Sequence, residues 1–348
     1  EREDDEFGSD AELFDGLDAL PDDVSVDAFF ARYERDAAMR PRIEAARGFI
    51  EGFDAADPRI ASARAIAQEW RSGIDSTAAR PRAGYGPAFA FLLAECAKRG
   101  ADVRFSATVT RIGWGDGGVT IALSDAGGRA YTLHARICVV TLPAGVLRQA
   151  GAAAAPAFDP PLPAEKRGAL AAIEMGNAVK AVLWFRTRFW EGLAGGRYRN
   201  GAFFQGGGAF AVFWTALPRR DGPVTAWVGG PGSAALEGSP NAVVDRAVDE
   251  FGAIFGETEL VRKEFATGAA HDWRNDPFAR GAYSYVRVGG GDARTVLGAS
   301  LGGVLFFAGE ATALGGTSGT VEGALESGER AGREALQALA SYEGANRE

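Results

Sequence analysis

The sequence is poor in the residues that build metal sites, disulfide frameworks and surfaces for polyanions. It contains two cysteines and two histidines, and lysine is rare, at four of the 37 basic residues. With so few histidines we expect no histidine-based metal site. The net charge of −9 argues against nucleic acid as a partner, because such binding depends on basic patches. No apolar run reaches the roughly 20 residues of a membrane-spanning helix.

The two cysteines lie in segments with apolar patterns, Cys96 in a helical one and Cys138 in a strand-like one. We therefore expect two buried thiols. Free thiols are typical of a reducing compartment, which suggests a cytoplasmic protein.

Glycine, by contrast, is abundant at 48 residues, about twice its usual share of roughly 7%. This favours tight turns and close backbone approaches, as in α/β proteins that hold a cofactor. The apolar patterns predict helices and strands in a definite order. The expected helices are 26–30, a helix opened by Pro41, one ending near Trp70, and 88–99, 241–255 and 321–339. The expected strands are 103–105, 108–114, 119–123, 131–134, 137–143, 178–185, 210–217, 224–229, 260–267, 282–288 and 304–308, and 151–165 is expected to be a loop. The continuous apolar run 137–143 suits a strand that is buried on both faces.

The strongest local signal lies near the end of the chain. An apolar strand, L-F-F-A-G-E-A-T at 305–312, leads into G-G-T-S-G at 315–319 and then T-V-E-G-A-L-E-S-G at 320–328. A buried strand, a glycine-rich turn and a helix N-terminus form a unit that binds phosphates and other anions. From the residues alone, a βα turn without a ligand is an equally good interpretation.

This segment resembles the C-terminal FAD-binding motif of the flavin-containing amine oxidases, which include monoamine oxidases, polyamine oxidases and histone demethylases. Three further stretches resemble the same family in the same order. They are V-T-R-I at 109–112 with T-L-P at 141–143, G-N-A-V-K at 176–180, and W-x-x-D-P-x-x-x-G-x-Y at 273–283. The resemblance extends from about residue 49 to about residue 336.

The resemblance implies FAD as the cofactor and a role for each matching residue. The implied FAD-binding residues are Val109, Thr141, Pro143, Trp273, Gly309, Glu310, Thr320 and Val321. Lys180 is the implied catalytic lysine, which holds a water against flavin N5, and Tyr283 the implied catalytic residue that faces the amine. Without the resemblance, a lysine whose ammonium reaches solvent and aromatic residues that pack in a core are the commoner interpretations. Tyr285 shares a strand face with Tyr283, and His271 is interpreted as a surface or packing residue.

The implied fold is α/β with an α+β substrate domain, an FAD/NAD(P)-binding, glutathione-reductase-like two-domain fold. No Gly-x-Gly-x-x-Gly follows a buried strand, so we expect the first Rossmann βαβ unit to be lacking and to come from a missing N-terminal segment or a second chain. The predicted segments are 1–80, the helical part of the substrate domain; 81–150, the FAD-binding helix, β-meander and parallel strand; 151–299, the substrate-binding domain with a mixed sheet; 300–340, the C-terminal FAD-binding strand, loop and helix; and 341–348, a tail.

The implied function is FAD-dependent oxidation of a small-molecule amine, with hydride transfer from the α-carbon to flavin N5, hydrolysis of the imine and reoxidation by O2. One alternative is a desaturase or porphyrinogen oxidase of the same flavoprotein superfamily. These enzymes share the C-terminal FAD motif but not, as a rule, the lysine and the Trp/Tyr pair. Another is a truncated, non-catalytic chain that does not hold flavin. The sequence does not identify the amine.

Overall fold

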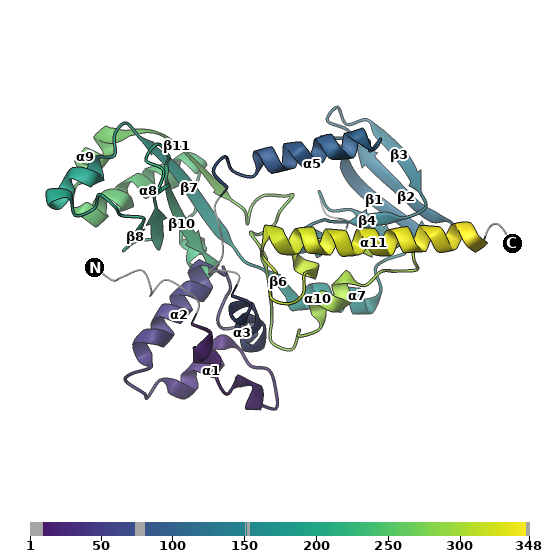
Figure 1. The fold of residues 1–348 in the computed structure, drawn as a ribbon, viewed down its shortest axis with the longest axis horizontal. Helices are drawn as coiled ribbons and strands as arrows, with labels where there is room; N and C mark the ends of the chain where they lie inside the picture. Colours follow the sequence, from purple (N-terminus) through teal and green to yellow (C-terminus); the bar gives the residue numbers. More distant parts are fainter. Residues whose placement is uncertain (1–9, 74–80, 150, 152–153, 346–348) are drawn as a thin grey trace. The chain divides into compact units, whose positions relative to one another are not determined.

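The computed structural model describes residues 10–73, 81–149, 151 and 154–345. Parts of the predicted helical segment (1–9 and 74–80) and of the predicted tail (346–348) lie outside these residues. The chain divides into two compact units, each assembled from separate segments (Figure 1). Unit 1 comprises Glu1–Ala11, Ala67–Ala171 and Asp292–Glu348, and unit 2 comprises Glu12–Ile66 and Ala172–Gly291.

The helices of unit 2 begin where the sequence predicts. Helix α1 (Val26–Phe30) starts after Ser25, whose hydroxyl accepts a hydrogen bond from the Ala28 N–H. This N-cap satisfies one of the donors that a first helical turn leaves unpaired. Helix α2 (Arg40–Gly52) buries the predicted stripe of Ile43, Ala46 and Ile50. Helix α3 (Ala63–Arg71) also follows the predicted pattern and contributes its first residues to this unit.

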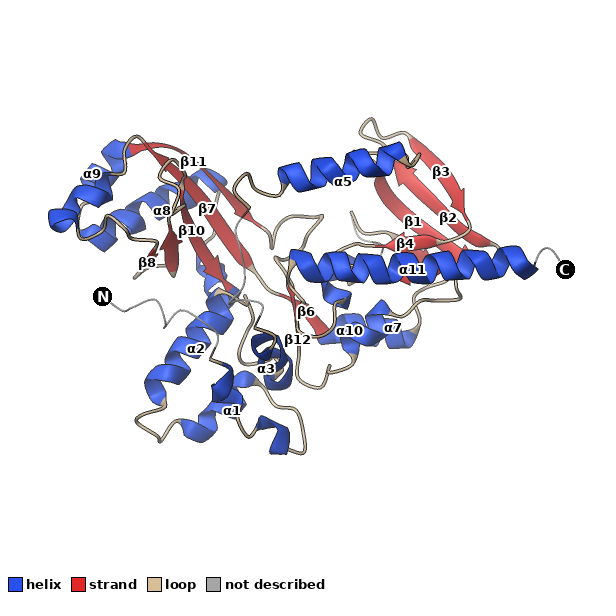
Figure 2. Ribbon diagram, in the orientation of Figure 1, coloured by secondary structure: helices blue, strands red, loops and turns tan. Residues whose placement is uncertain are grey.

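Unit 2 is built around a five-stranded sheet with the order β11-β7-β10-β9-β8. Its neighbouring strands are antiparallel: β7 (Ala178–Phe185), β8 (Phe203–Gln205), β9 (Val212–Trp214), β10 (Val224–Gly229) and β11 (Phe265–Asp272). Helix α8 (Pro240–Phe255) packs against one face and continues into α9 (Thr258–Glu264), as Figure 2 shows. A two-stranded sheet, β6 (Ile173–Met175) with β12 (Ser284–Val286), completes the unit.

The core of unit 2 is a cluster of aromatic side chains between this sheet and α8. Phe251 is fully buried, and six aromatic rings lie with their centroids within 6.3 Å of its own. Alternation along β7 directs Val179, Ala181 and Leu183 into this core. The opposite face of the sheet therefore carries the side chains of Lys180, Val182 and Trp184.

Two predicted strands of unit 2 differ from the structure, and two short strands were not predicted. Residues 260–264 are helical, and the strand starts only at Phe265. The predicted strand 210–217 shortens to β9 because the Ala209 and Phe210 N–H groups donate to the Glu250 carboxylate instead of to a strand. The short strands β6 and β8 have no counterpart among the predictions.

Unit 1 contains the predicted β-meander as part of a sheet with the order β3-β2-β1-β5. Its strands are β1 (Thr108–Gly115), β2 (Gly118–Ser124), β3 (Ala130–Ala135) and β5 (Ala157–Asp159). Strand β5 lies within the predicted loop 151–165 and pairs with β1 in parallel. The predicted strand 103–105 does not form: Val103 and Phe105 are exposed, and the Arg104 side chain forms an ion pair with Asp102.

A separate parallel pair lies beside the C-terminal helix of unit 1. Strand β4 (Cys138–Val140) pairs in register with β13 (Leu305–Phe307), and Phe306 and Ala308 pack against α11 (Val321–Ala345). All three residues of β13 are buried, as predicted. Strand β4 was expected to be buried on both faces, and this is wrong: Val139 is 39% exposed and Cys138 half-buried. Helix α11 continues six residues beyond its predicted end.

Helix α5 (Gly86–Lys98) forms where predicted and ends at Gly100, whose φ of +80° suits a helix C-terminus. None of its residues is buried. Phe89 and Phe91 are 56% and 65% exposed, and Cys96 is exposed. The prediction of a buried Cys96 is therefore wrong, because nothing among the described residues covers this apolar helix.

Three further short helices complete unit 1: α6 (Ala144–Leu147), α7 (Ala164–Ala172) and α10 (Ala293–Gly298). Residues 151–171 and 292–299 thus belong to unit 1, whereas the sequence groups them with the substrate-binding segment. The assignment of cofactor-binding and substrate-binding domains stays a prediction. None of the helices among the described residues is long and apolar enough to cross a membrane.

Candidate active site

The predicted cofactor residues of unit 1, with the exception of Val109, lie at or shortly after the carboxyl ends of β4 and β13. The Ala308 N–H donates to the Val140 carbonyl at 3.0 Å, so Thr141 and Gly309 lead out of the sheet side by side. A Cβ built on Gly309 would lie 3.8 Å from the Thr141 oxygen, and the φ of +120° at Gly309 suits only glycine. Pro143 follows two residues after Thr141 and precedes α6. The carboxyl end of parallel strands is the usual place for ligands in α/β folds.

A glycine loop connects β13 to α11 and is closed by Glu310. The Glu310 carboxylate accepts a hydrogen bond from the Gly319 N–H at 2.9 Å. Thr320 caps α11, because its hydroxyl accepts from the Gly323 N–H at 3.0 Å. The next residue, Val321, is exposed at the start of the helix. The structure thus brings Gly309, Glu310, Thr320 and Val321 into one loop and helix N-terminus.

The start of α11 packs tightly against this loop. A Cβ at Gly323 would lie 2.1 Å from the Thr317 carbonyl oxygen, so no other residue fits there without a shift of the loop. Ser327, one turn on, accepts a hydrogen bond from the Gly309 N–H at 2.9 Å and donates to the Gly309 oxygen. A Cβ at Gly315, by contrast, would meet nothing within 4 Å. The loop is fixed on its helix side and open around Gly315.

Three cationic side chains brace the elements behind the loop. Lys166 is 2% exposed, donates to the Val296 and Leu297 carbonyls at 2.8 and 2.7 Å and to that of Ala299, and lies 4.1 Å from the Phe307 ring centroid. Arg330 donates to the Phe307 and Gly298 carbonyls at 2.8 and 3.0 Å. Arg294 is 8% exposed and donates to the Ala311 carbonyl at 3.3 Å. These three side chains connect α7, α10 and α11 to the end of β13.

Glu69 connects one of these cationic side chains, Arg294, to the glycine loop. Its carboxylate lies 3.4 Å from Arg294 Nη2 and accepts a hydrogen bond from the Ser318 hydroxyl at 2.5 Å. A Cβ at Gly316 would meet Ser72 and the Gln68 carbonyl at 2.8 and 2.9 Å, so the end of α3 also touches the loop. Sequence reasoning missed Lys166, Glu69, Arg294 and Arg330, because their partners are distant in sequence and no local motif marks them.

The loop has the features that a flavin nucleotide requires. The first N–H groups of a helix have no intrahelical acceptor, and the N-terminus of a helix favours negative charge. Gly315 and Gly319 adopt φ of +73°, which allows the backbone to face a ligand closely. Lys166, Arg294 and Arg330 add positive charge behind the loop. The residues present therefore fit an anionic nucleotide or the anionic edge of a reduced flavin.

Val109 lies apart from this loop. It is half-buried on β1, opposite Leu123, where the register shifts before Arg111. No hydrogen bond or strand pairing connects it to β4, β13 or the glycine loop among the described residues. Its role with adenine stays a prediction.

The other predicted residues belong to unit 2 and gather at the start of β7. Lys180 is half-buried on the face opposite the aromatic core. It pairs across the sheet with Trp227 on β10 and with His271 on β11. The burial pattern of β7 places Val182 and Trp184 on the same face as Lys180, and Trp184 is 41% exposed.

Trp273 follows β11 and is held beside the same strand end. Its N–H donates to the Ala178 carbonyl at 3.2 Å, and its carbonyl accepts from the Gly281 N–H at 2.9 Å. The His271 ring stands edge-on to the Trp273 ring, with centroids 4.6 Å apart. His271 Nε2 also lies 3.2 Å from the Asp276 carboxylate. His271, interpreted as a packing residue, thus contacts both a predicted site residue and the Asp276-Pro277 turn.

Tyr283 lies at the same end, just before β12. Its carbonyl accepts from the Gly176 N–H at 2.7 Å, and its hydroxyl donates to the Phe53 carbonyl at the end of α2. Tyr285 is different: it is 4% exposed, and burial raises the pKa of its hydroxyl to about 12. Of the two tyrosines that the sequence leaves open, Tyr283 is the accessible one.

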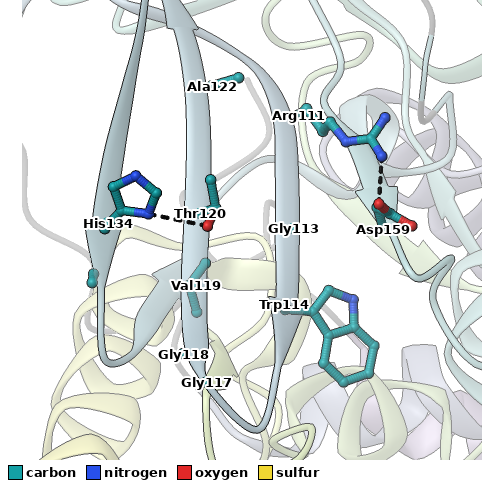
Figure 3. A pocket seen from close by; sticks show the side chains of 11 residues that line it. Arg111, Gly113, Trp114, Gly117, Gly118, Val119, Thr120, Ala122, His134 and Asp159 are labelled. Atoms are coloured by element: carbon teal, nitrogen blue, oxygen red, sulfur yellow. Dashed lines mark hydrogen bonds and ion pairs between the residues drawn. The ribbon is translucent and has the colours of Figure 1, made fainter.

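A depression of about 490 Å³ lies elsewhere, on the β-meander of unit 1 (Figure 3). Its polar side chains pair with one another: Arg111 with Asp159, and the Thr120 hydroxyl with His134 Nδ1 at 3.2 Å. None of the predicted site residues lines it. Nothing in this depression converges on a ligand. No cluster of three or more His, Cys, Asp or Glu side chains suited to a metal ion is found in the part of the chain that the structure describes.

The sequence profile of the flavin-containing amine oxidoreductases matches residues 8–336. The chain belongs to this family. The predictions of an amine-oxidase-type oxidoreductase and of flavin as the cofactor, FAD in the structural neighbours, are confirmed at the level of the family.

Relatives and solved structures agree with this assignment. The chain is 33% identical over 265 residues to a possible lysine-specific histone demethylase 1 of Drosophila melanogaster, and 29% identical over 239 residues to the human lysine-specific histone demethylase 2. These matches cover 70% and 65% of this chain but only 29% and 27% of the relatives, so the chain spans less than a third of their length.

The fold is that of solved amine oxidases. Putrescine oxidase bound to putrescine matches with a TM-score of 0.71 at 19% identity, covering 96% of this chain and 71% of that one. Cyclohexylamine oxidase from Brevibacterium oxydans matches with a TM-score of 0.69 at 18% identity, covering 96% and 73%. The mixed α/β architecture is thereby established, whereas the predicted lack of a first βαβ unit stays a prediction.

Proposed function

We propose that this chain carries the amine-binding residues and the C-terminal cofactor loop of an FAD-dependent amine oxidase. The observation that carries the proposal is the meeting of Lys180, Trp273 and Tyr283 at one end of β7, in a chain of this family. The desaturase and porphyrinogen oxidase alternative lacks support from these residues, which match the amine oxidase motif.

When bound, the flavin supplies the two-electron acceptor for oxidation of the carbon next to the amine nitrogen. The chain's own residues orient the reactants and exclude water. Lys180 is proposed to hold a water through its ammonium. Trp273 and Tyr283 are proposed to offer ring faces, which attract a protonated amine as it enters. Water then hydrolyses the imine product, and O2 is the final oxidant.

In unit 1, Gly309, Glu310, Thr320 and Val321 are proposed to hold the cofactor. Gly319 and the first turn of α11 present N–H groups, and the braced cations behind the loop favour negative charge there. Thr141 and Pro143 are proposed to pass beneath the ring system, and Val109 to contact the adenine through its backbone. A first βαβ unit that would hold the pyrophosphate is proposed to come from outside these 348 residues.

The test is rapid mixing of the full-length, flavin-loaded protein with a panel of amines in the absence of oxygen. Loss of flavin absorbance is expected with at least one amine, followed by recovery when oxygen is admitted. Lys180→Met should slow one of these steps by roughly tenfold or more, which corresponds to about 1.4 kcal/mol of transition-state stabilisation. Lys263→Met is the matched control, because Lys263 is an exposed lysine at the end of α9. The proposal fails if no amine reduces the flavin, and the role of Lys180 fails if both variants match the parent.

A further inference from the structure

His271 lies next to two of the proposed site residues of unit 2. Strand register places it directly opposite Lys180 on β7, and residues directly opposite each other in an antiparallel pair share one face of the sheet. Trp273 follows two positions further along the chain. The His271 and Trp273 ring centroids are 4.6 Å apart, with 74° between the ring planes. His271 is therefore a neighbour of both residues.

Burial does not fix the His271 ring. Strand β11 is at the end of the strand order of its sheet, with β7 as its neighbour, and the His271 side chain is 50% exposed. A side chain with this much exposure can change rotamer unless specific contacts select one. The contacts that can select one here are those with Asp276 and Trp273.

The Asp276 carboxylate is itself fixed by the turn that follows Trp273. Its Oδ1 accepts a hydrogen bond from the Phe278 N–H at 2.8 Å, and its Oδ2 lies 3.2 Å from His271 Nε2. The Gly281 N–H returns to the Trp273 carbonyl at 2.9 Å and closes the turn. The turn thus starts and ends at Trp273 and presents a carboxylate oxygen to the His271 ring.

The Trp273 backbone is held more firmly than its indole ring. The backbone N–H donates to the Ala178 carbonyl at 3.2 Å, and the carbonyl accepts from Gly281. These bonds leave the two side-chain torsions of the indole to be set by its neighbours. The edge-on His271 ring is such a neighbour. Aromatic pairs of this geometry change an equilibrium constant by about two- to tenfold beyond the effect of the area that they bury.

Resting on the proposed function, we propose that His271 is a positioning residue of the amine oxidase site. Its ring is anchored by Asp276 and sets the orientation of the Trp273 indole, which contacts the flavin. His271 thus acts through Trp273 and not by touching the flavin or the amine. The interpretation of His271 from the sequence as a surface or packing residue is revised accordingly.

A double-mutant cycle tests whether His271 acts through Trp273. His271→Ala, Trp273→Ala and the double variant of the full-length protein are freed of flavin and titrated with FAD. His271→Ala should raise the Kd for FAD about two- to tenfold, and Trp273→Ala should raise it by at least as much. In the Trp273→Ala background, His271→Ala should change the Kd by less than about twofold. Additive effects would overturn the proposal, because His271 would then act independently of Trp273.

Two further substitutions separate the His271 ring from its nitrogen. His271→Phe keeps a ring that can pack on Trp273 and loses the contact with Asp276, whereas His271→Gln keeps a nitrogen donor and loses the ring. The affinity for FAD should fall from the parent to His271→Phe and then to His271→Gln, which should resemble His271→Ala. A higher affinity in His271→Gln than in His271→Phe would overturn the proposal, because a polar group and not a ring would then be required.

His134→Ala is the matched control. His134 is the other histidine of the chain and is exposed on β3 of unit 1. Its substitution should leave the Kd for FAD within about twofold of the parent value, as is usual for an exposed site. An increase in this Kd as large as that of His271→Ala would show that the effect is not specific to His271, and would overturn the proposal.

A second cycle tests the other neighbour, Lys180, through the rate of flavin reduction by an amine without oxygen. His271→Ala should slow this reduction by the same factor in the Lys180→Met background as in the parent. If the effect disappears in Lys180→Met and persists in Trp273→Ala, His271 acts on Lys180 and the proposal is wrong. If no amine reduces the flavin of the parent, the proposed function itself fails. If the parent reacts and the changes at His271 and Trp273 are additive, only the present inference fails.

Discussion

Different interactions stabilise each of the two units of this chain. Unit 2 is stabilised by stacked aromatic rings around Phe251, with a sheet on one side and a helix on the other. The cofactor half of unit 1 is held by three cationic side chains that donate to backbone carbonyls around β13: Lys166 and Arg294, which are buried, and Arg330, which is half-buried. Burial and the charge of Arg330 lower the pKa of Lys166, so we expect the stability of unit 1 to depend on pH through this residue. Apolar packing therefore dominates in the core of unit 2, and hydrogen bonds from cationic side chains dominate around β13 of unit 1.

The largest expected effect is on the aromatic core. Phe251→Ala removes a fully buried ring from the centre of six others, and should lower the free energy of unfolding by about 3–5 kcal/mol. Phe91→Ala on α5 is the matched change in unit 1, where the ring is 65% exposed, and should change it by less than about 0.5 kcal/mol. Urea unfolding of both variants gives the two values. A similar loss of unfolding free energy in both variants would show that the apolar face of α5 is covered in solution.

The second prediction concerns the cationic bracing. Burial and the charge of Arg330 lower the pKa of Lys166 to about 8. The unfolded chain, with an ordinary lysine pKa of about 10.4, then binds this proton more tightly than the folded chain between these two values. The stability of the protein should therefore rise from pH 8 to pH 10.5, by at most about 3 kcal/mol. The three carbonyl acceptors and the Phe307 ring favour the ammonium form, so the rise should fall below this limit.

Lys166→Met removes the titration and supplies the control. The difference in unfolding free energy between parent and variant, measured at pH 8 and pH 10.5, isolates Lys166 from the other groups that titrate there. The variant should also be less stable at pH 7, because three backbone carbonyls, among them that of the buried Leu297, lose their donor. A pH-independent difference would show that Lys166 keeps an ordinary proton affinity, and that the bracing does not depend on its charge.

A third prediction concerns retention of the cofactor by unit 1. The parallel pair β4–β13 and the exposed rings of α5 present unpaired strand edges and apolar surface. The 348-residue chain alone should therefore bind FAD weakly and tend to aggregate. Supplying a preceding segment with a first βαβ unit should give a yellow protein. Flavin in a one-to-one ratio on the chain purified alone, read from its visible absorbance, would contradict this.

The smallest expected effects are those of substituting Trp273 and Tyr283 in unit 2, and they should differ in kind. Trp273→Ala removes the ring that stands against His271 and is expected to weaken flavin retention. Tyr283→Ala removes a half-buried ring and should raise KM severalfold and lower kcat/KM for amines without releasing flavin. Flavin content and steady-state kinetics of the full-length enzyme check both. Unchanged values in both variants would mean that these aromatic rings only pack.

The sequence predicts the longer elements of this fold well and the short ones poorly. Helices α2, α8 and α11 have sustained apolar patterns and cap or proline signals, so their starts are predicted correctly. Residues 260–264 of helix α9 were predicted as the start of a strand, because a short segment around Leu260 and Val261 fits either period. Its helical form depends on packing against α8, where a Cβ at Gly252 would lie 2.6 Å from Thr258. That contact is not visible in a local pattern.

For the candidate site too, local motifs could be predicted and contacts between distant residues could not. The motif residues Glu310, Thr320 and Val321 could be identified from the sequence because they lie in one short stretch of the chain. The partners of Lys166 and Glu69 could not, since they lie more than a hundred residues away along the chain. Burial of Cys96 was inferred from a helical pattern, but a pattern shows only which face is apolar and not whether anything covers it.

The pairing of β4 with β13 has a consequence for how the protein is made. Cys138 meets Leu305 only across the inserted segment Ala172–Gly291 of unit 2. As the chain leaves the ribosome, the strands of unit 2 emerge together and can pair early. The β4 edge must wait until β13 has been translated, because contacts between distant residues form late. The cofactor loop, which lies at the end of β13, is therefore the last part of the site to assemble, and slow translation after Gly291 would prolong the time during which β4 can pair wrongly.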